Sequence, residues 1–301
     1  YTFINICFIW IYYIIIKINK NLIFSKNTRP IIIAEISANH CGNKKLFLKL
    51  IEKAHLAGAD VVKIQSYEPQ DITLNSRAEK FKIKNGIWKG KYLWDIYKKT
   101  QTPFKWHRDA FKLAKKRKIT LFSTPFSLRA VDLLEKENVE FYKIASLEND
   151  DEMLIKKIAK TKKPIIISTG MMDFKEVKRL YQFIKKKKFK NQICFLHCVS
   201  SYPVPINELN LNSIRFLKEK LPDCIIGYSD HSDSIESCIL SAYLGANIIE
   251  KHFTLDKNYS SFRDHKLSAT PAEMKRLVET VRNLDNILGK KKKFIQKCEK
   301  D

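Results

Sequence analysis

Two histidines end short apolar segments that lie close together in the sequence. Residues 225–231 read IIGYSDH and residues 247–252 read NIIEKH, and residues 235–245 between them favour a helix that ends at a glycine. This is the pattern of a strand–helix–strand unit. The carboxyl ends of parallel strands open onto one face, so His231 and His252 are expected to lie together. Neutral imidazole suits first-row transition metals, and the pair predicts a divalent metal site; the alternative is two ordinary buried or loop histidines.

The elements that would position these histidines continue along the chain as a βα alternation. Six further apolar segments are predicted as strands, at residues 31–36, 61–65, 120–123, 141–144, 165–168 and 193–197. Helices are predicted at 45–56, 104–118, 127–137, 151–160, 174–186, 211–221, 235–245 and 271–288. Eight strands that alternate with amphipathic helices predict a single (β/α)8 TIM barrel over residues 27–290. Residues 66–103 form a long excursion to which no element is assigned.

Polar side chains follow the other predicted strands, where a barrel places its chemistry. Lys63 and Lys143 stand inside strands, and a buried lysine is costly unless it meets an anion. One lysine paired with Glu35 or Glu148 would need no functional explanation. Two lysines, with Ser and Thr hydroxyls at four more strand ends, indicate a cage for phosphate and carboxylate groups. His197 also ends a strand, and we interpret it as a packing or supporting residue.

Composition and charge limit the classes of protein to which the chain can belong. The 301 residues are 45% hydrophobic, which is enough for a large core, and carry a formal net charge of +24. That charge fits a nucleic-acid partner or anionic substrates, but we find no zinc-finger spacing and no aromatic RNA-binding signature. An overall Lys, Ile and Asn bias explains the charge, and we expect no nucleic-acid partner. Seven cysteines without paired spacing indicate reduced thiols and a cytoplasmic protein.

The two ends of the chain fall outside the predicted barrel. Residues 1–26 are an apolar N-terminal extension, in which 16–24 alternate as a small hairpin capping the barrel floor would. Residues 1–16 lack the basic segment of a secretory signal and fall short of the ~20 residues that span a bilayer. A fragment start or upstream translated sequence is favoured over a membrane anchor. Residues 291–301 form a basic C-terminal tail.

At its strand ends the sequence resembles the sialic acid synthase family, whose members condense phosphoenolpyruvate with an N-acetylated hexose. The matching segments are IIIAEISANH, GADVVKIQSY, FSTPF, YKIASLE, PIIISTGM, LHCVSSYP, GYSDH, GANIIEKHFTL and RDHKLSATP, in unbroken order over about residues 28–290. The resemblance implies a (β/α)8 barrel that binds Mn²⁺, or Mg²⁺ or Co²⁺ in its place. It names the class of product, a nonulosonic (sialic-type) acid of nine carbons.

The resemblance also implies a role for individual residues. Glu35 matches the proposed catalytic carboxylate, and His231 and His252 match the metal ligands. Phosphoenolpyruvate-binding positions are matched by Lys63, Thr124, Lys143, Ser146, Ser168, Ser200 and Ser229. Acceptor-sugar contacts are matched by Gln65, Glu148, Tyr202 and Asp264. In the implied mechanism the metal polarises the acceptor's aldehyde, the phosphoenolpyruvate methylene attacks it, water adds, and phosphate leaves by C–O cleavage.

Two departures from the family pattern stand out. Family members usually continue into a small antifreeze-like domain that reaches the partner subunit's site, whereas this sequence stops at Asp301. We interpret the tail as a truncated linker. A homodimer is a possible assembly that the sequence leaves open. Residues 263–266 read RDHK where many members have Gly-Pro-Asp.

The acceptor sugar is left open by conflicting segments. FKIKNGIWKGKYLWDIY is similar to pseudaminic acid synthases, and DHKLS to N-acetylneuraminate and legionaminic acid synthases. The acceptor is therefore N-acetylmannosamine or a diacetamido-trideoxyhexose. Alternatives are another phosphoenolpyruvate–aldose synthase or a metal aldolase on the same barrel and, from a different class, a basic nucleic-acid-binding protein on an inactive barrel.

Overall fold

Eight parallel strands form the centre of the molecule. The computed structural model describes residues 15–17, 23–25, 29–85, 88–186 and 192–300, the first two segments as backbone only. The strands are β3 (Ile31–Glu35), β4 (Val61–Ser66), β5 (Thr120–Pro125), β6 (Tyr142–Ile144), β7 (Ile165–Ser168), β8 (Ile193–Cys198), β9 (Ile225–Asp230) and β10 (Ile248–His252). Each lies within two residues of its predicted bounds.

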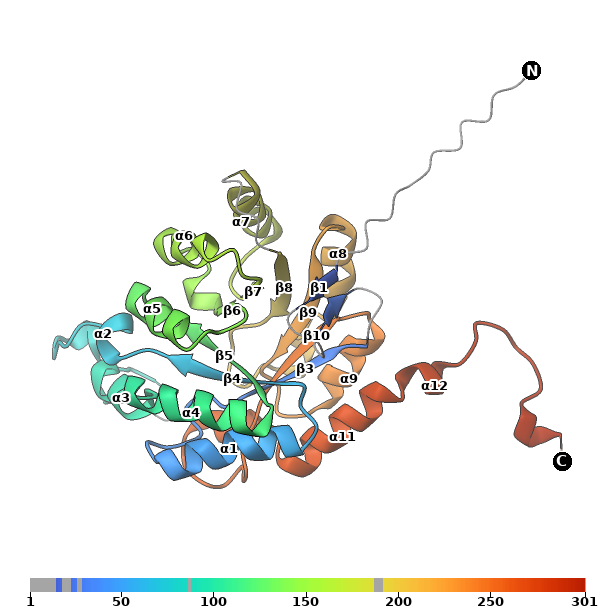
Figure 1. Ribbon diagram of the computed structural model, residues 1–301, viewed down its shortest axis with the longest axis horizontal. Coiled ribbons are helices and arrows are strands. Elements are labelled where there is room, and N and C mark those ends of the chain that lie inside the picture. The colour runs from blue at the N-terminus through green and yellow to red at the C-terminus, as the bar shows by residue number, and fades with distance from the viewer. Residues whose placement is uncertain (1–14, 18–22, 26–28, 86–87, 187–191, 301) are drawn as a thin grey trace, which may run out of the picture.

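The strands curl into a nearly closed barrel. Their order is β5-β4-β3-β10-β9-β8-β7-β6, with β5 beside β6 at the seam. The rings of Phe122 and Phe141 pack across that seam with centroids 4.3 Å apart. Figure 1 shows the helices arranged around the strands. The predicted (β/α)8 barrel is confirmed.

One helix follows each strand and covers the outside of the sheet. These helices are α1 (Lys44–Leu56), α4 (Phe104–Arg117), α5 (Leu128–Lys136), α6 (Glu152–Lys160), α7 (Phe174–Lys186), α8 (Asn212–Lys220), α9 (Glu236–Tyr243) and α11 (Pro271–Arg282). Local signals start several of them: Thr270 and Glu273 form a capping box at α11, and Asp151 caps α6. The predicted helix 271–288 is wrong in one respect, because Asn283 ends α11 and a short α12 (Leu284–Leu288) follows.

Several short elements in the loops escape the sequence prediction. The excursion at residues 66–103 contains α2 (Pro69–Ile72), η1 (Glu79–Phe81) and α3 (Leu93–Thr100), and the loop after β10 contains α10 (Arg263–Leu267). The remaining short turns are η2 (Ser146–Glu148), η3 (Ile206–Glu208) and η4 (Lys297–Glu299). Helices of three to eight residues are too short for a helical period to be read reliably.

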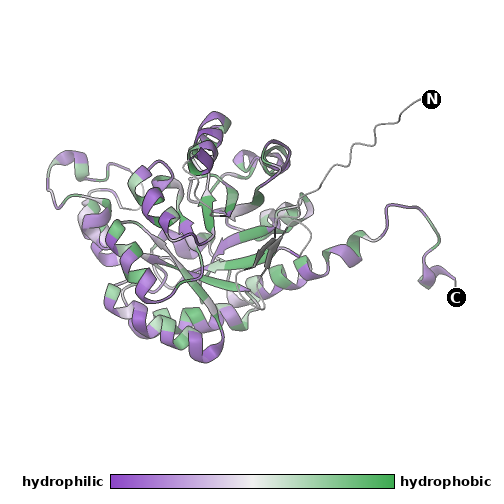
Figure 2. Ribbon diagram, turned by 45° about the horizontal axis from the view of Figure 1, so that its top comes forward, coloured by the Kyte–Doolittle hydropathy of each residue, from purple (hydrophilic) through white to green (hydrophobic). Residues whose placement is uncertain are grey.

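Strand alternation divides the apolar residues into two cores. One core fills the barrel and includes Ile31, Ile33, Phe122 and Ile248, and the larger one lies between the sheet and the helices. Figure 2 shows the apolar strands at the centre and helices whose polar residues face outward. Because side chains alternate along a strand, residues of the same parity as the inner core point into the barrel, and the last of them on each strand lies at its open end.

The chain before the barrel is described in part. β1 (Ile15–Lys17) and β2 (Ile23–Ser25) pair antiparallel, with Ile15 opposite Ser25, as the predicted hairpin requires. That this hairpin caps the barrel floor stays a prediction, as does the division into extension, barrel and tail. The expectations for residues 1–14 lie outside the described residues. None of the described helices has the length and apolar composition that crossing a bilayer requires.

Gly227 on β9 leaves room for the neighbouring strands. A Cβ at this position would lie 2.3 Å from the Ile248 carbonyl oxygen and 2.6 Å from Leu196 Cδ2. Since neither neighbour can move without shifting a strand or the core, Gly227→Ala is expected to lower the free energy of unfolding by about 1–3 kcal/mol. Urea denaturation of the variant measures the change. An unchanged midpoint would contradict the packing described for this strand.

Candidate active site

The open end of the barrel holds a cavity of about 560 Å³ lined by the last inward-facing residues of the strands. Small-molecule sites are commonly of this size, ~300–1,000 Å³. Strand parity explains why the lining is polar here. The same alternation that buries Ile31 and Ile33 makes Glu35, at the end of β3, point into the cavity, and that of Ile248 does the same for Glu250 and His252 on β10.

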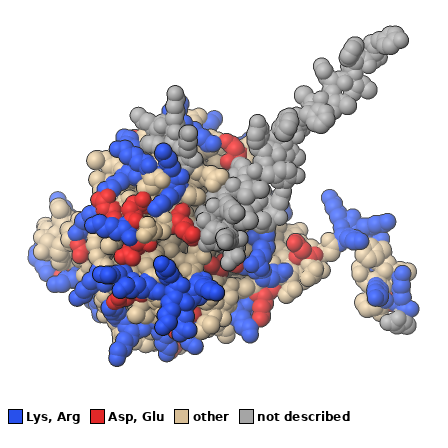
Figure 3. Space-filling view, viewed as in Figure 1, with Lys and Arg blue, Asp and Glu red and all other residues tan. Residues whose placement is uncertain are grey.

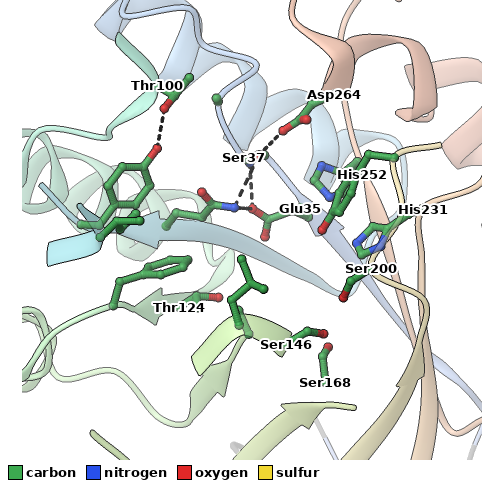
Figure 4. A pocket seen from close by; sticks show the side chains of 18 of the residues that line it. Glu35, Ser37, Thr100, Thr124, Ser146, Ser168, Ser200, His231, His252 and Asp264 are labelled. Carbon is green, nitrogen blue, oxygen red and sulfur yellow. Dashed lines mark hydrogen bonds between the residues drawn. The ribbon is translucent and has the colours of Figure 1, made fainter. Parts of the chain in front are cut away.

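Every residue that the sequence resemblance marks as functional lines this one cavity. They are Glu35, Lys63, Gln65, Thr124, Lys143, Ser146, Glu148, Ser168, Ser200, Tyr202, Ser229, His231, His252 and Asp264. In Figure 4, Glu35, His231 and His252 lie toward one side, with Ser146, Ser168 and Ser200 below them. The roles of these residues stay predictions, but they do meet in one place.

Two lysines and two carboxylates form a buried charge cluster at the base of the cavity. Lys63 Nζ lies 2.7 Å from Glu35 Oε2 and 3.4 Å from Glu250 Oε1, and Lys143 Nζ lies 3.6 Å from the same Glu250 oxygen. All four side chains are nearly inaccessible to solvent. The ion pair of Lys63 with Glu35 would by itself account for one buried lysine without a functional role. It does not account for Lys143, which shares Glu250 with Lys63.

The cluster holds its carboxyl groups in different states. Burial alone would raise the pKa of Glu250, but Lys143 and Lys63 lower it to about 2. Burial raises the pKa of Glu35, against the pull of Lys63. Burial lowers the pKa of Lys143, while Glu250 and Glu35 outweigh burial and raise that of Lys63. One ionised carboxylate beside a carboxyl group of raised pKa gives the site a group that can exchange a proton.

Hydroxyl groups surround the lysines and leave space for an anion. Lys63 Nζ donates to Thr124 Oγ1 at 3.1 Å and Lys143 Nζ to Ser168 Oγ at 2.6 Å. The Gly170 amide donates to Ser146 Oγ at 3.1 Å, and a Cβ on Gly170 would lie 2.2 Å from Ser200 Oγ. The backbone therefore approaches the hydroxyls as closely as only glycine permits. Ammonium, hydroxyl and amide donors that converge in this way suit phosphate and carboxylate oxygens.

The two histidines lie side by side at the rim. The ring centroids of His231 and His252 are 5.5 Å apart, and Tyr202 stacks on His231 at 4.0 Å. His231 Nδ1 lies 2.8 Å from the Val199 carbonyl oxygen. Because a carbonyl only accepts, Nδ1 carries a hydrogen, and Nε2 is the ring nitrogen that could bind a metal. His252 Nδ1 is buried and has no hydrogen-bond partner among the described residues.

These features fit a divalent cation. Metal-binding histidines usually donate their other ring N–H to a carbonyl or carboxylate, as His231 does. Burial holds the pKa of His252 well below its ordinary value, which keeps that ring neutral. For His231 burial is outweighed by Cys198 and the Val199 carbonyl, which raise its pKa, so a bound metal would displace a proton. Within the described part of the chain no third His, Cys, Asp or Glu joins the two histidines in a group that could hold a metal ion, so the protein side chains of this kind at the site are His231 and His252 alone.

Residues of opposite parity lie outside the barrel and support the rim. Lys251 donates to Asp230 Oδ2 at 2.5 Å in a fully buried ion pair between β9 and β10. This pair joins the two strands directly beside His231 and His252. His197 also faces outward, where its Nε2 lies 2.8 Å from the Leu209 carbonyl oxygen, in agreement with the packing role predicted for it.

A further set of polar contacts lies between the charge cluster and the mouth. Gln65 Nε2 donates to Glu35 Oε1 at 3.1 Å, and Ser37 Oγ donates to Asp264 Oδ2 at 2.6 Å. Burial raises the pKa of Glu148 to about 7, and its Oε2 has no hydrogen-bond partner in the described residues. These groups can meet the hydroxyl and amide groups of a sugar.

Several lining residues were not assigned a role from the sequence. Glu250 is the clearest case: it lies two residues before His252 on the same strand, so the alternation of side chains along a strand predicts that it faces the cavity too. Cys198, which lies 3.8 Å from His231 Nδ1, shares the parity of Leu196 in the inner core. Trp88 lies in a turn and Arg263 begins the five-residue helix α10, and neither segment is long enough for a periodic signal.

The family match settles which kind of barrel this is. Residues 50–293 match the sequence profile described as the NeuB family. The chain belongs to the NeuB family. It is similar to the pseudaminic acid synthase of Campylobacter jejuni, with 41% identity over 266 residues that cover 88% of this chain and 77% of the relative. The N,N'-diacetyllegionaminic acid synthase of the same species is 39% identical over 263 residues, 87% of this chain and 78% of the relative.

A solved structure of the same family agrees with the fold. The N-acetylneuraminic acid synthetase of Leptospira borgpetersenii serovar Hardjo-bovis, in complex with citrate, superimposes with a TM-score of 0.82 at 31% identity, covering 95% of this chain and 94% of that chain. These NeuB relatives are named as synthases of different nonulosonic acids, so the family identifies the class of enzyme and leaves the sugar open.

Proposed function

We propose that this NeuB-family protein condenses phosphoenolpyruvate with an N-acetylated aldose to form a nonulosonic acid and inorganic phosphate. The observation that carries the proposal is the single cavity in which two buried lysines and a ring of hydroxyls lie beside Glu35 and the histidine pair. Membership of the family supports the reaction class. The specific sugar, a homodimeric assembly and a cytoplasmic location remain proposals.

Phosphoenolpyruvate would occupy the base of the cavity. Its phosphate and carboxylate carry more negative charge than Glu250 alone, so they would compete for Lys63 and Lys143. The hydroxyls of Thr124, Ser146, Ser168, Ser200 and Ser229 line the same space and would complete the hydrogen bonds. The packed apolar core of the barrel lies beneath this space, and its low dielectric would strengthen each of these interactions.

The acceptor would enter from the rim as its open-chain aldehyde. His231 and His252 would hold a divalent cation, Mn²⁺ or else Mg²⁺ or Co²⁺, which when bound supplies Lewis-acid polarisation of the aldehyde oxygen. Gln65, Glu148, Tyr202 and Asp264 would orient the sugar so that its aldehyde carbon faces the phosphoenolpyruvate methylene. The new carbon–carbon bond joins those two carbons.

Glu35 would act as the general base in the second half of the reaction. The C–C bond leaves C2 of the former phosphoenolpyruvate electron-deficient, and a water adds there as it gives its proton to the Glu35 carboxylate. The aldehyde oxygen, an alkoxide after the C–C bond forms, takes the proton held by Glu35 and becomes a hydroxyl. The C2–O bond to phosphate then breaks and its electron pair leaves with the phosphate, which takes the proton of the new C2 hydroxyl as C2 becomes the keto carbon of the product. Lys63, 2.7 Å from Glu35, would stabilise the charge as it moves.

The buried Glu148 makes the free energy of unfolding depend on pH. Burial raises its pKa to about 7, so the folded protein binds a proton that the unfolded chain loses near 4.5. Glu148 therefore destabilises the fold as pH rises from about 4.5 through 7, and the cost ends when the acid is protonated at lower pH. Glu148→Gln should remove this cost, which is about 1.4 kcal/mol per unit of pKa difference, so the variant gains stability over wild type as pH rises.

Denaturant unfolding at pH 5 and pH 8 measures this effect, with the surface variant Glu219→Gln on α8 as the control. The control should show no pH-dependent difference of this kind. A Glu148→Gln variant that is no more stable than wild type at pH 8, relative to pH 5, would contradict the buried, proton-binding state of Glu148.

Turnover assays test the reaction class. The protein is incubated with phosphoenolpyruvate, Mn²⁺ and either N-acetylmannosamine or diacetamido-trideoxyhexoses, and phosphate release is followed. Release that requires one of these sugars supports the proposal. Turnover with a pentose phosphate and none with any six-carbon acetamido sugar would favour another phosphoenolpyruvate–aldose synthase.

The positive charge does not point to a separate function on the visible face. Figure 3 shows Lys and Arg side chains spread over several helices, with Asp and Glu among them. Salt-sensitive binding of DNA or RNA at physiological salt, without metal uptake or phosphate release, would instead favour a nucleic-acid-binding barrel.

A further inference from the structure

The thiol of Cys41 lies beside a histidine outside the cavity. Cys41 belongs to the loop after β3, and its Sγ lies 3.3 Å from His265 Nε2 and 3.3 Å from Ser260 Oγ. Cys41 is partly exposed, whereas the His265 ring is buried. Neither residue lines the cavity, and the sequence resemblance implies a role for neither. The pair is therefore separate from the groups that the proposed reaction uses.

Contacts on the other side of the His265 ring fix its tautomer. His265 Nδ1 lies 2.7 Å from Thr254 Oγ1, and the Thr254 hydroxyl donates to the Asp256 carbonyl oxygen at 3.0 Å. Because a hydroxyl has only one hydrogen to give, Thr254 must accept from the Nδ1–H of the ring. Burial lowers the pKa of His265, which favours the neutral ring. Its Nε2 therefore presents a lone pair to the Cys41 thiol.

This arrangement has the parts of an activated nucleophile. Cysteine reacts as its thiolate, and it is activated by a nearby base that takes the thiol proton and is itself oriented by a third group. Ser260 adds a donor, since its Oγ accepts from the Phe262 amide at 3.2 Å and keeps its own hydrogen for the sulfur. Negative charge that develops on Cys41 Sγ would thus meet an N–H of His265 and the O–H of Ser260.

The other described cysteines differ from Cys41 in exposure. Four of them are buried, namely Cys194, Cys198, Cys224 and Cys238. Cys198 also lies near a histidine, but that contact is with His231 Nδ1, which carries the hydrogen that faces the Val199 carbonyl. Cys298 is exposed on the C-terminal tail and serves as the comparison for reactivity that comes from exposure.

The loop that carries Cys41 is tied to Asp264 in the cavity wall. Asn39 Nδ2 donates to Ser268 Oγ at 2.9 Å, and Ser268 Oγ donates to the Asp264 carbonyl oxygen at 2.5 Å. Asp264 is one of the lining residues drawn in Figure 4. Since His265 follows Asp264 in α10, a group attached to Cys41 and pressed against His265 would displace Asp264 as well.

We propose that Cys41 is a modification site, at which a thiol activated by His265 forms a mixed disulfide with a low-molecular-weight disulfide and thereby weakens binding of the acceptor sugar. The reactivity of the thiol is independent of the proposed function, whereas the effect on the acceptor rests on it. In the cytoplasm, the location proposed above, disulfides are mostly transient and sense redox conditions. The modification is then a reversible response to oxidised small thiols.

The exchange needs no further oxidant or reductant. The Cys41 thiol gives its proton to His265 Nε2, and its sulfur attacks one sulfur of the disulfide. A new S–S bond forms and the old one breaks. The electron pair of the broken bond leaves with the second sulfur, which takes the proton from His265 and departs as a thiol. Cys41 is oxidised, the departing half is reduced, and attack by a free thiol on the mixed disulfide reverses the step.

The test follows modification of the intact protein by excess glutathione disulfide, with peptide mapping by mass spectrometry at timed intervals. Wild type is compared with Cys41→Ser, His265→Gln and Thr254→Val. Cys298 is an internal control, because it is more exposed than Cys41. His55→Gln is the matched control for the histidine, since it makes the same substitution at the opposite end of α1 from the Cys41 loop.

Both comparisons should show at least about a tenfold difference, a modest part of the ~10²–10⁴-fold that a positioned base contributes. Cys41 should react that much faster than Cys298 in wild type, and His265→Gln should slow the reaction at Cys41 by that factor. Thr254→Val leaves the base in place without its partner and should slow it less. His55→Gln should match wild type. If circular dichroism shows that His265→Gln is unfolded, Thr254→Val and the wild-type ratio decide.

The effect on the acceptor is measured with N-acetylmannosamine or a diacetamido-trideoxyhexose, phosphoenolpyruvate and Mn²⁺. The mixed disulfide at Cys41 should raise KM for the better sugar by about tenfold or more, the loss of a hydrogen bond to a charged group, while KM for phosphoenolpyruvate changes less than about threefold. Dithiothreitol should restore the original KM. Cys41→Ser treated in the same way should keep its untreated KM, which excludes an effect of modification elsewhere.

Two kinds of result would overturn the inference while the proposed function stands. Modification of Cys41 no faster than that of Cys298, or at a rate that neither His265→Gln nor Thr254→Val lowers, would overturn the activated thiol. An unchanged sugar KM in the modified enzyme would overturn its link to acceptor binding. Absence of phosphate release by unmodified wild type with every sugar is a different outcome. It overturns the proposed function and the effect on the acceptor, and the peptide mapping still decides whether the thiol is activated.

Discussion

Glu35→Gln is expected to lower kcat by about 10²–10⁴-fold, the range of a positioned general acid or base. Glutamine has nearly the same shape and can still meet Lys63, but it cannot take a proton from the water that adds to C2. Because Lys63, Lys143 and the hydroxyls remain, KM for phosphoenolpyruvate should change much less than kcat.

The matched control for this experiment is Glu135→Gln. Glu135 also pairs with a lysine, since its Oε1 lies 2.6 Å from Lys163 Nζ, but it does not line the cavity. The control should keep wild-type kcat. Single-turnover measurements with phosphoenolpyruvate and the best acceptor give the rate of the chemical steps. A Glu35→Gln enzyme whose rate falls less than threefold would rule out the proton-transfer role.

His231→Ala and His252→Ala are expected to abolish metal-stimulated turnover, because Lewis-acid polarisation supplies several kcal/mol to such reactions. Each variant should also lose tight binding of Mn²⁺, measured by electron paramagnetic resonance in the absence of substrate. Binding of phosphoenolpyruvate should suffer less, since its proposed ligands lie at the base of the cavity. Both variants should stay folded, because the two side chains lie at the rim.

His197→Ala is the control for the histidine pair. His197 ends the neighbouring strand β8 and is nearly as buried, yet it faces away from the cavity and contacts the Leu209 carbonyl. It should keep Mn²⁺ binding. Loss of the metal from His197→Ala together with its retention by the His231 and His252 variants would contradict the ligand assignment.

The barrel and the base of its cavity follow from local sequence patterns. A parallel strand buried on both faces reads as an apolar run, and alternation along the strand fixes which of its last residues point inward. The sequence therefore places Lys63, Lys143 and His252 at the open end of the barrel. The capping residues Asp151 and Thr270 likewise mark helix starts within one residue. These features depend on neighbours a few positions away.

The mouth of the cavity could not be predicted in the same way. Trp88 and Arg263 meet because the excursion after β4 and the loop after β10 fold over the same rim. Neither segment has a periodic sequence pattern from which this contact could be predicted. Short elements such as α3 and α10 are held by tertiary packing rather than by helix propensity. The alternation of inward and outward residues along β10 predicts that Glu250 points into the cavity. Its shared pairing with Lys63 and Lys143 depends on how far β4, β6 and β10 are shifted relative to one another, which the sequence does not give.

The central claim is that this cavity joins phosphoenolpyruvate to an acylamino sugar and expels phosphate by cleaving the C–O bond. The most direct measurement uses phosphoenolpyruvate labelled with ¹⁸O at the bridging oxygen, with Mn²⁺ and the acceptor sugar that supports turnover. Mass spectrometry should find the label in the inorganic phosphate and one equivalent of a nonulosonic acid without it. Label retained at C2 of the product, or phosphate formed without a new acid, would contradict the account.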